Sequence, residues 1–290
     1  MKRIIALILA LLLLLCGCGK EEPAETTLGA EIQENPTETV NTGEGEGILD
    51  PTTEIRYLIV KKIVTNDQGQ ELWGTEYSYD ETGFCTAERE YSNIGTPAAS
   101  RVNSPDMLGR IGSSLFTEQD SSQYNVTYTY DEFDRCIQEN FLYEDGTEKM
   151  VAYTYNEQGN YLTIREYLDG ELVMDYGFSY TYDGTGCQVS MDEYLFGDLL
   201  HHTAFTYDAE GREIATVTSL VNGEVQSRTE SQWDGLTETR YFYSGEDAEP
   251  FMVSVFTYDD NGNVVFEETR QGDTVINRAE YIYEPFEVKK

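Results

Sequence analysis

The chain has 290 residues, with 54 acidic and 19 basic side chains and a formal net charge of −35 at pH 7. Such an acidic surface repels nucleic acid and anionic lipid, so nucleic-acid binding is excluded as a function. The two histidines, His201 and His202, are adjacent in a predicted strand and therefore point to opposite faces. No metal site or cofactor is expected from them.

The N-terminal residues have the pattern of an export signal. Lys2 and Arg3 precede an apolar run at 4–15, too short to cross a ~30 Å hydrocarbon core as a helix. The next residues, 15–18, read LCGC and resemble the lipobox of bacterial lipoproteins, whose cysteine is diacylated. The resemblance implies a signal peptide at 1–17, lipidation of Cys18, and an exported chain anchored to the outer face of a bacterial membrane. An ordinary cleaved signal with incidental cysteines is the alternative.

Residues 18–53 are predicted to form an acidic, disordered tether. They are rich in Glu, Thr, Gly and Pro and contain no aromatic residue, so they cannot bury a core. A flexible coil of about 35 residues spans roughly 30 Å on average. The tether would hold a folded domain at 54–290 clear of the lipid headgroups.

An aromatic-x-Tyr-Asp-x-x-Gly signature recurs about every 25 residues from 54 to 290, which is typical of a repeat protein. A second set of glycines lies midway between the signatures, several preceded by Asp or Asn, and these pairs favour tight hairpin turns. Each unit is therefore predicted to be strand, turn, strand, turn. The last aromatic of each signature is Tyr79, Tyr130, Tyr155, Tyr182, Tyr207, Trp233, Tyr258 or Tyr283.

The acid and glycine of the signature are predicted to shape its turn. The Asp or Asn side chain can accept hydrogen bonds from turn amides, and Gly can adopt the positive φ that ends the turn. Signature carboxylates in neighbouring copies would lie about 9.5 Å apart, too far for an ion ladder, although local acidic clusters could bind Ca²⁺ weakly. The residues given this structural role are Asp80, Gly83, Asp131, Asn156, Gly159, Asp183, Gly186, Asp208, Gly211, Asp234, Asp259 and Gly262.

The strand pattern predicts an all-β fold. Along 172–182 apolar and aromatic residues alternate with mainly polar ones, so one face of the sheet is apolar and the other wet. We expect an antiparallel meander of tandem β-hairpin repeats, with about 16 strands in a strongly curved or spiralling sheet. A transmembrane barrel is disfavoured because both faces are polar in places, as at 161–166.

The segment 92–122 breaks the pattern for one period. Ser104, Pro105 and Asp106 have the form of a helix start, whereas Asp106 and Gly109 keep the spacing of the signature turn. The segment is thus either an irregular insertion or a decayed repeat. Irregular elements on regular scaffolds often carry function, and a tolerated insertion is the alternative.

Three cysteines, Cys85, Cys136 and Cys187, occupy equivalent positions at intervals of 51 residues. Equivalent positions in adjacent copies would be about 9.5 Å apart, whereas a disulfide needs Cα atoms within about 7 Å. We therefore expect unpaired thiols that act as small hydrophobes, which would suit a reducing or anaerobic setting.

The repeated unit resembles the YD repeats of the RHS (rearrangement hotspot) family over about 210 residues. The copy at 208–212 comes closest, with Arg212 after the glycine, whereas Asp134 replaces the glycine in another copy and Trp233-Asp234-Gly235 shortens a third. The resemblance implies a curled sheet of hairpins and, in large members, a shell around a C-terminal toxin. That role is not expected here, because the strands are too few and no toxin-like segment follows the last copy.

No nucleophile motif, metalloprotease motif or phosphate-binding loop is found in the sequence. The signature aromatics are expected to form the core. The favoured function is a non-enzymatic, lipid-anchored extracytoplasmic module that binds or scaffolds an unidentified protein or glycan. The alternatives are a carbohydrate-active enzyme with a carboxylate pair in the sheet groove, and a structural or immunity-type relative of RHS systems.

Overall fold

The computed structural model describes residues 53–92 and 99–289, which form one antiparallel sheet of 18 strands. The strands are β1 (Thr53–Thr65), β2 (Glu71–Tyr79), β3 (Cys85–Ser92), β4 (Ser100–Pro105), β5 (Ile111–Thr117), β6 (Gln123–Tyr130), β7 (Cys136–Tyr143), β8 (Glu148–Tyr155), β9 (Tyr161–Leu168), β10 (Glu171–Tyr182), β11 (Gln188–Leu195), β12 (Asp198–Tyr207), β13 (Glu213–Leu220), β14 (Val225–Asp234), β15 (Thr237–Ser244), β16 (Met252–Tyr258), β17 (Val264–Gln271) and β18 (Thr274–Lys289). The predicted signal peptide, Cys18 and nearly all of the predicted tether lie outside the described residues.

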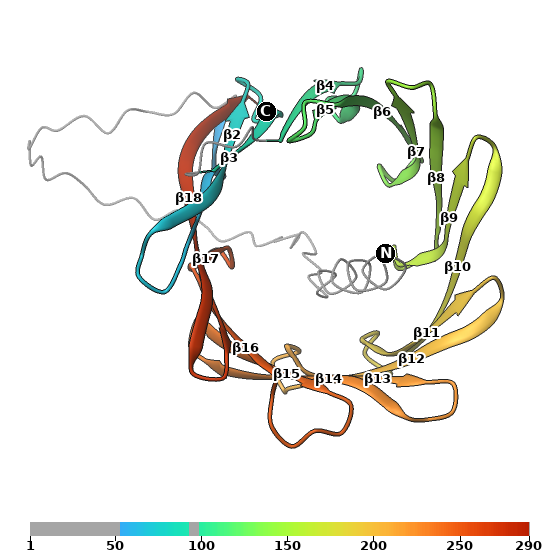
Figure 1. The fold of residues 1–290 in the computed structure, drawn as a ribbon, viewed down its shortest axis with the longest axis vertical. Helices are drawn as coiled ribbons and strands as arrows, with labels where there is room; N and C mark the ends of the chain where they lie inside the picture. The colour runs from blue at the N-terminus through green and yellow to red at the C-terminus, as the bar shows by residue number, and fades with distance from the viewer. Residues whose placement is uncertain (1–52, 93–98, 290) are drawn as a thin grey trace, which may run out of the picture. The chain divides into compact units, whose positions relative to one another are not determined.

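The sheet closes into a barrel (Figure 1). Each strand pairs with its neighbour in sequence, and β1 pairs with β18 from Thr53 opposite Lys289 to Thr65 opposite Arg278. The predicted all-β meander is confirmed, while the curvature goes as far as closure and the strands number 18 instead of about 16. Closure pairs the backbone groups that an open sheet would expose at its two edges.

The two strands beyond the expected number come from the segment that breaks the sequence pattern. Residues 100–117 form the hairpin β4–β5, with Asp106 and Gly109 in its turn and a φ of +80° at Gly109. The Oδ1 atom of Asp106 accepts hydrogen bonds from the amides of Leu108 and Arg110, at 2.8 and 3.0 Å. The helix considered for Ser104–Asp106 does not form, because β4 continues through Pro105 into this turn.

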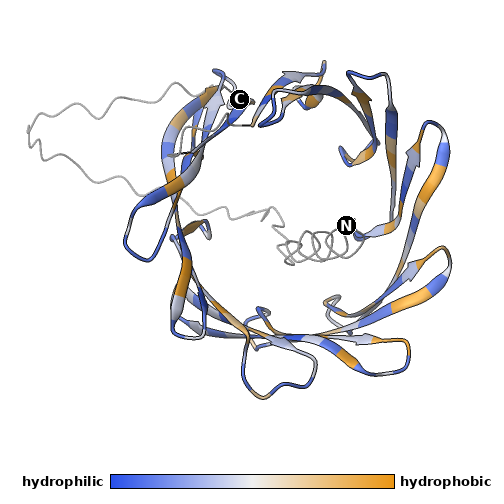
Figure 2. Cartoon of the chain, in the orientation of Figure 1, coloured by the Kyte–Doolittle hydropathy of each residue, from blue (hydrophilic) through white to orange (hydrophobic). Residues whose placement is uncertain are grey.

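One face of the sheet carries the aromatics of every signature, two in each copy except the one with Ser231 before Trp233, and we call it the tyrosine face. Hydrophobic and hydrophilic positions are interspersed along the strands around the ring (Figure 2). The most buried position on the tyrosine face lies four residues before the last aromatic of the signature. In seven copies this residue is less than a tenth exposed: Thr75, Val126, Val151, Phe178, Thr203, Ser254 and Ala279. A belt of small and apolar side chains therefore forms the core beside the aromatic rings.

Candidate functional site

The signature turns all lie at one end of the barrel, which we call the signature rim. Except between β14 and β15, each turn is a short loop followed by a one-residue bulge in the ladder, as between Thr181 and Tyr182. In the copy at 183–187, Oδ1 of Asp183 accepts hydrogen bonds from the amides of Thr185 and Cys187, at 2.8 and 3.0 Å. Equivalent pairs of bonds are made by Asp80, Asp106, Asp131, Asn156, Asp208 and Asp259.

The residue that ends the turn adopts a positive φ in each of these copies. Asp134, which replaces the glycine in one copy, has a φ of 60°, a conformation that Asp tolerates better than most residues. Gly83, Gly159, Gly186, Gly211 and Gly262 have φ between 79° and 88°. The sequence-assigned turn residues thus lie around one rim and form a structural series without converging on one point.

Asp234 differs from the other signature acids. It is the last residue of β14 and pairs with Thr237 across a shorter turn that contains Gly235. Nearby, the buried carboxylate of Glu238 accepts hydrogen bonds from Ser231 Oγ at 2.6 Å and from Tyr258 Oη at 2.8 Å. Its Oε1 also accepts from Arg240 Nε at 2.9 Å. Glu238, just after the shortened turn, therefore provides the acceptor for Tyr258, the signature tyrosine of the following copy.

In most other copies the tyrosine hydroxyl donates to a backbone carbonyl of the preceding hairpin. Tyr130 Oη lies 2.8 Å from the Ile111 oxygen, and Tyr207 Oη lies 2.8 Å from the Gln188 oxygen. The same bond is made by Tyr79, Tyr155 and Tyr283, and in one copy by the first aromatic, Tyr180, instead of the last. Burial raises the pKa of Tyr79 to about 12, so its hydroxyl stays protonated as a donor at neutral pH. These hydroxyls hold adjacent hairpins together.

In three copies an arginine directly follows the turn. The sequence indicated this feature at Arg212. Its guanidinium pairs with the signature Asp and stacks on the aromatic of the next hairpin. The distances from Cζ to the ring centre are 4.4 Å for Arg110 on Tyr130, 4.8 Å for Arg135 on Tyr155 and 5.0 Å for Arg212 on Trp233. Sequence reasoning did not find this connection, because the ring belongs to a later copy.

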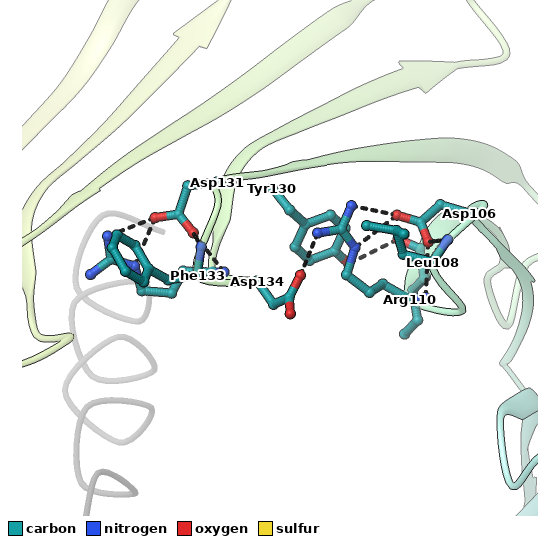
Figure 3. Close-up of polar contacts among 9 residues, drawn as sticks. Asp106, Leu108, Arg110, Tyr130, Asp131, Phe133 and Asp134 are labelled. Carbon is teal, nitrogen blue, oxygen red and sulfur yellow. Dashed lines mark hydrogen bonds and ion pairs between the residues drawn. The ribbon is translucent and has the colours of Figure 1, made fainter. Parts of the chain in front are cut away.

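Among these three arginines, Arg110 is the one that forms an ion pair with an acid of a neighbouring signature turn. Its guanidinium binds Asp106 at 2.7 Å on its own turn and Asp134 at 2.6 Å on the neighbouring turn (Figure 3). The hydrogen bond that Arg110 donates to Asp106 raises the pKa of Arg110 above its usual range. Partial burial favours the neutral form of Asp106, but hydrogen bonds from Arg110 and Leu108 outweigh it and lower the pKa of Asp106. Both groups are therefore charged at neutral pH.

The same two turns expose three large apolar side chains, which we call the tip patch. Met107 is fully exposed, Leu108 is 73 % exposed and Phe133 is 69 % exposed. The signature turns at 80–83, 156–159, 183–186, 208–211 and 259–262 carry Glu, Thr, Gln, Asp, Asn, Ala or Gly at the corresponding positions. The tip patch therefore distinguishes the turns of β4–β5 and β6–β7 from those five.

The other candidate residues, the two histidines and the three cysteines, do not gather at one site. His201 Nδ1 lies 3.0 Å from Glu193 and His202 Nδ1 lies 2.6 Å from Asp192, in two separate pairs. Cys85, Cys136 and Cys187 are free thiols. Among residues 53–92 and 99–289, no group of three or more His, Cys, Asp or Glu side chains is placed to hold a metal ion. In the same ranges no helix has the length and apolar character to cross a membrane.

No known protein family and no curated protein matches the chain. Among solved structures, a porin-like protein from Bacteroides uniformis is similar, with 12 % identity, a TM-score of 0.44, and coverage of 78 % of this chain and 96 % of that one. A porin-like protein from Bacteroides vulgatus has 13 % identity and a TM-score of 0.33, with 78 % and 98 % covered. The complex TcdB2-TccC3-Cdc42 has 11 % identity and a TM-score of 0.28 over 77 % of this chain. The match spans 16 % of that much longer chain.

Proposed function

We propose that this chain is a non-enzymatic, lipid-anchored extracytoplasmic binding module, related to the RHS/YD-repeat proteins, whose tip patch contacts a partner protein. The observation that carries the proposal is the exposure of Met107, Leu108 and Phe133 on two adjacent turns. Burying one such side chain fully is worth about 1.5–3 kcal/mol, so three together can anchor an interface.

The two turns are held in a fixed relation before any partner binds. Arg110 joins them through Asp106 and Asp134, and its stacking on Tyr130 fixes the guanidinium. A preorganised surface loses less conformational entropy on binding than a flexible one. This rigidity supports a binding role for the tips.

The charge around the tip patch indicates the chemistry of the partner. Asp131, Glu132 and Asp134 lie beside Phe133 in a chain whose net charge is −35. Acidic groups at this position repel an anionic membrane and favour a partner surface with an apolar pocket and basic residues at its edge. The lipid anchor itself is supported by the lipobox resemblance at 15–18.

The test uses the full-length chain in its own membranes, with a photo-crosslinking amino acid in place of Phe133. We expect one discrete protein adduct, which is lost when Leu108→Asp is added. The matched control carries the crosslinker at Phe196, which is also exposed but lies on a turn at the opposite rim. Adducts with lipid, or an adduct that survives Leu108→Asp, would refute the protein partner.

Two further measurements address the rest of the proposal. Fatty-acid labelling should be lost in a Cys18→Ala variant, and continued labelling would contradict the anchor assignment. Incubation of the purified chain with a glycan panel should release no product. Turnover of any glycan would favour the carbohydrate-active alternative.

A further inference from the structure

The end of the barrel opposite the signature turns contains an open-sided hollow of about 430 Å³. It lies between the turn that joins β5 to β6 and the turn that joins β7 to β8. These turns are neighbours because β6 and β7 pair directly, with Tyr124 opposite Tyr143. Its lining includes Glu118, Gln123, Tyr124, Tyr143, Glu144 and Asp145.

Aromatic rings form one wall of the hollow. The ring centres of Tyr124 and Tyr143 are 5.2 Å apart at an angle of 38°. Phe116 stacks behind Tyr124, with ring centres 4.9 Å apart and planes 7° from parallel. Burial and the nearby Glu118 carboxylate raise the pKa of Tyr124 to about 12, so this ring stays neutral. A neutral tyrosine ring carries an electron-rich π system that attracts cations.

Carboxylates surround the rings without compensating cations. Glu118, Glu144 and Asp145 contribute three acids to the lining, and no Lys or Arg lines the hollow. Within the described ranges none of the three forms an ion pair, and Glu118 accepts a hydrogen bond from the Tyr124 hydroxyl. A hydrogen bond from the Thr147 amide to Asp145, at 2.9 Å, lowers the pKa of that carboxyl and keeps it ionised. The negative charge at this site is therefore available to a ligand.

We propose that this hollow binds an organic ammonium ion, which would lie against the rings of Tyr124 and Tyr143 with its charge facing Glu118 and Glu144. The three carboxylates repel an anionic ligand, and a neutral sugar gains nothing from their charge. The site lies at the opposite rim from the tip patch, so it does not depend on the proposed protein contact. The ammonium group could belong to a free amine or to a lysine side chain of a peptide.

Calorimetric titration of the full-length chain tests the proposal, with tetramethylammonium and 1,5-diaminopentane as free amines and an acetylated, amidated lysine peptide as the second source. We expect binding of at least one of these probes, weakened about tenfold by Glu118→Gln and by Tyr143→Leu. Glu157→Gln removes the same charge from an exposed acid at the signature rim and should leave the affinity unchanged.

Glu118→Gln is nearly isosteric and lies in a turn, so its result does not depend on the tolerance of the fold to Tyr143→Leu. The difference in affinity between the diamine and the peptide shows which source of the ammonium group is preferred. Absence of binding by every amine would overturn the proposal. Equal weakening by Glu157→Gln, or binding of maltose in place of the amines, would overturn it as well.

Discussion

The guanidinium of Arg110, on the turn between β4 and β5, lies 4.4 Å from the centre of the Tyr130 ring at the end of β6. Tyr130 in turn donates its hydroxyl hydrogen bond to the carbonyl of Ile111 at the start of β5. The β4–β5 hairpin is thus fixed to the next one by a stacked cation and a backbone bond.

The stacking between copies should appear as a coupling energy. In a double-mutant cycle of Arg212→Ala and Trp233→Leu, we expect a coupling of about 0.5–1 kcal/mol in the free energy of unfolding measured with urea. The control pairs Trp233→Leu with Arg165→Ala, because the Arg165 guanidinium binds Asp175 on a distant hairpin. In this control cycle the effects of the two substitutions on the free energy of unfolding should add. Equal coupling in both cycles would contradict the stacking interpretation.

The tyrosine-to-carbonyl bond should contribute to stability at each copy. Tyr207→Phe removes the bond to the Gln188 carbonyl and should lower the free energy of unfolding by about 1 kcal/mol. Tyr57→Phe is the matched control, since Tyr57 is 57 % exposed. Its effect should lie within error of zero in the same urea titration. Similar losses for both variants would show that the hydroxyl bond is not responsible.

The buried carboxylate of Glu238 should be the most sensitive acid in the described part of the barrel. Its side chain is 1 % exposed and joins Ser231, Arg240 and Tyr258, so Glu238→Leu leaves three donors without their acceptor. We expect a loss of about 3 kcal/mol, and a smaller loss for Glu238→Gln, which keeps one acceptor oxygen. Glu249→Leu, at an exposed loop position, serves as control and should change stability little.

The signature carboxylates should make stability depend on pH. Hydrogen bonds from Thr185, first from its hydroxyl and then from its amide, lower the pKa of Asp183. Because the pKa in the folded state is below the unfolded value of about 3.9, the contribution is present above that value and is lost as pH falls through the folded pKa. The stability difference between wild type and Asp183→Ala should therefore be largest near pH 6 and shrink below about pH 4. A difference that stays constant from pH 6 to pH 3 would contradict this assignment.

The three thiols should remain reduced in the folded chain. Cys85, Cys136 and Cys187 lie at or next to the starts of β3, β7 and β11, so successive thiols are four strands, or about 19 Å, apart. Burial raises the pKa of Cys85 and Cys136, which lowers their thiolate fraction. Peptide-level alkylation should be slow in the native state and fast in denaturant. Disulfide-linked peptides containing these residues would refute the prediction.

Much of the fold could be predicted from the sequence because its information is local and repeated. The 25-residue period, the Asp or Asn that binds turn amides and the glycine at positive φ each act within one hairpin. Asn156 shows this clearly, since its amide oxygen makes the same two bonds as the Asp residues. Asp134 likewise ends its turn at a φ of 60°, although the glycine is missing there.

The features that could not be predicted depend on residues far apart in the chain. Segment 92–122, which contains Met107 and Leu108, was a candidate from the sequence, but Phe133 was not. Met107 and Phe133 become neighbours only when β5 and β6 pair and Arg110 reaches Asp134. The hollow at the opposite rim was missed for the same reason, since Tyr124 and Tyr143 belong to different halves of the repeat. The repeat period alone gives no information about which variable residues become neighbours at a rim of the barrel.

By itself, the sequence determined that the chain is an all-β meander of hairpins with one aromatic face, because hydrogen bonding in turns and side-chain alternation are short-range. The tertiary structure decided that the meander closes, with Thr53 beside Lys289, and that the segment 100–117 supplies two of its strands. Closure depends on the accumulated curvature of all 18 strands, and a single repeat does not encode that sum. The same closure fixes which turns are neighbours and therefore where the tip patch and the hollow lie.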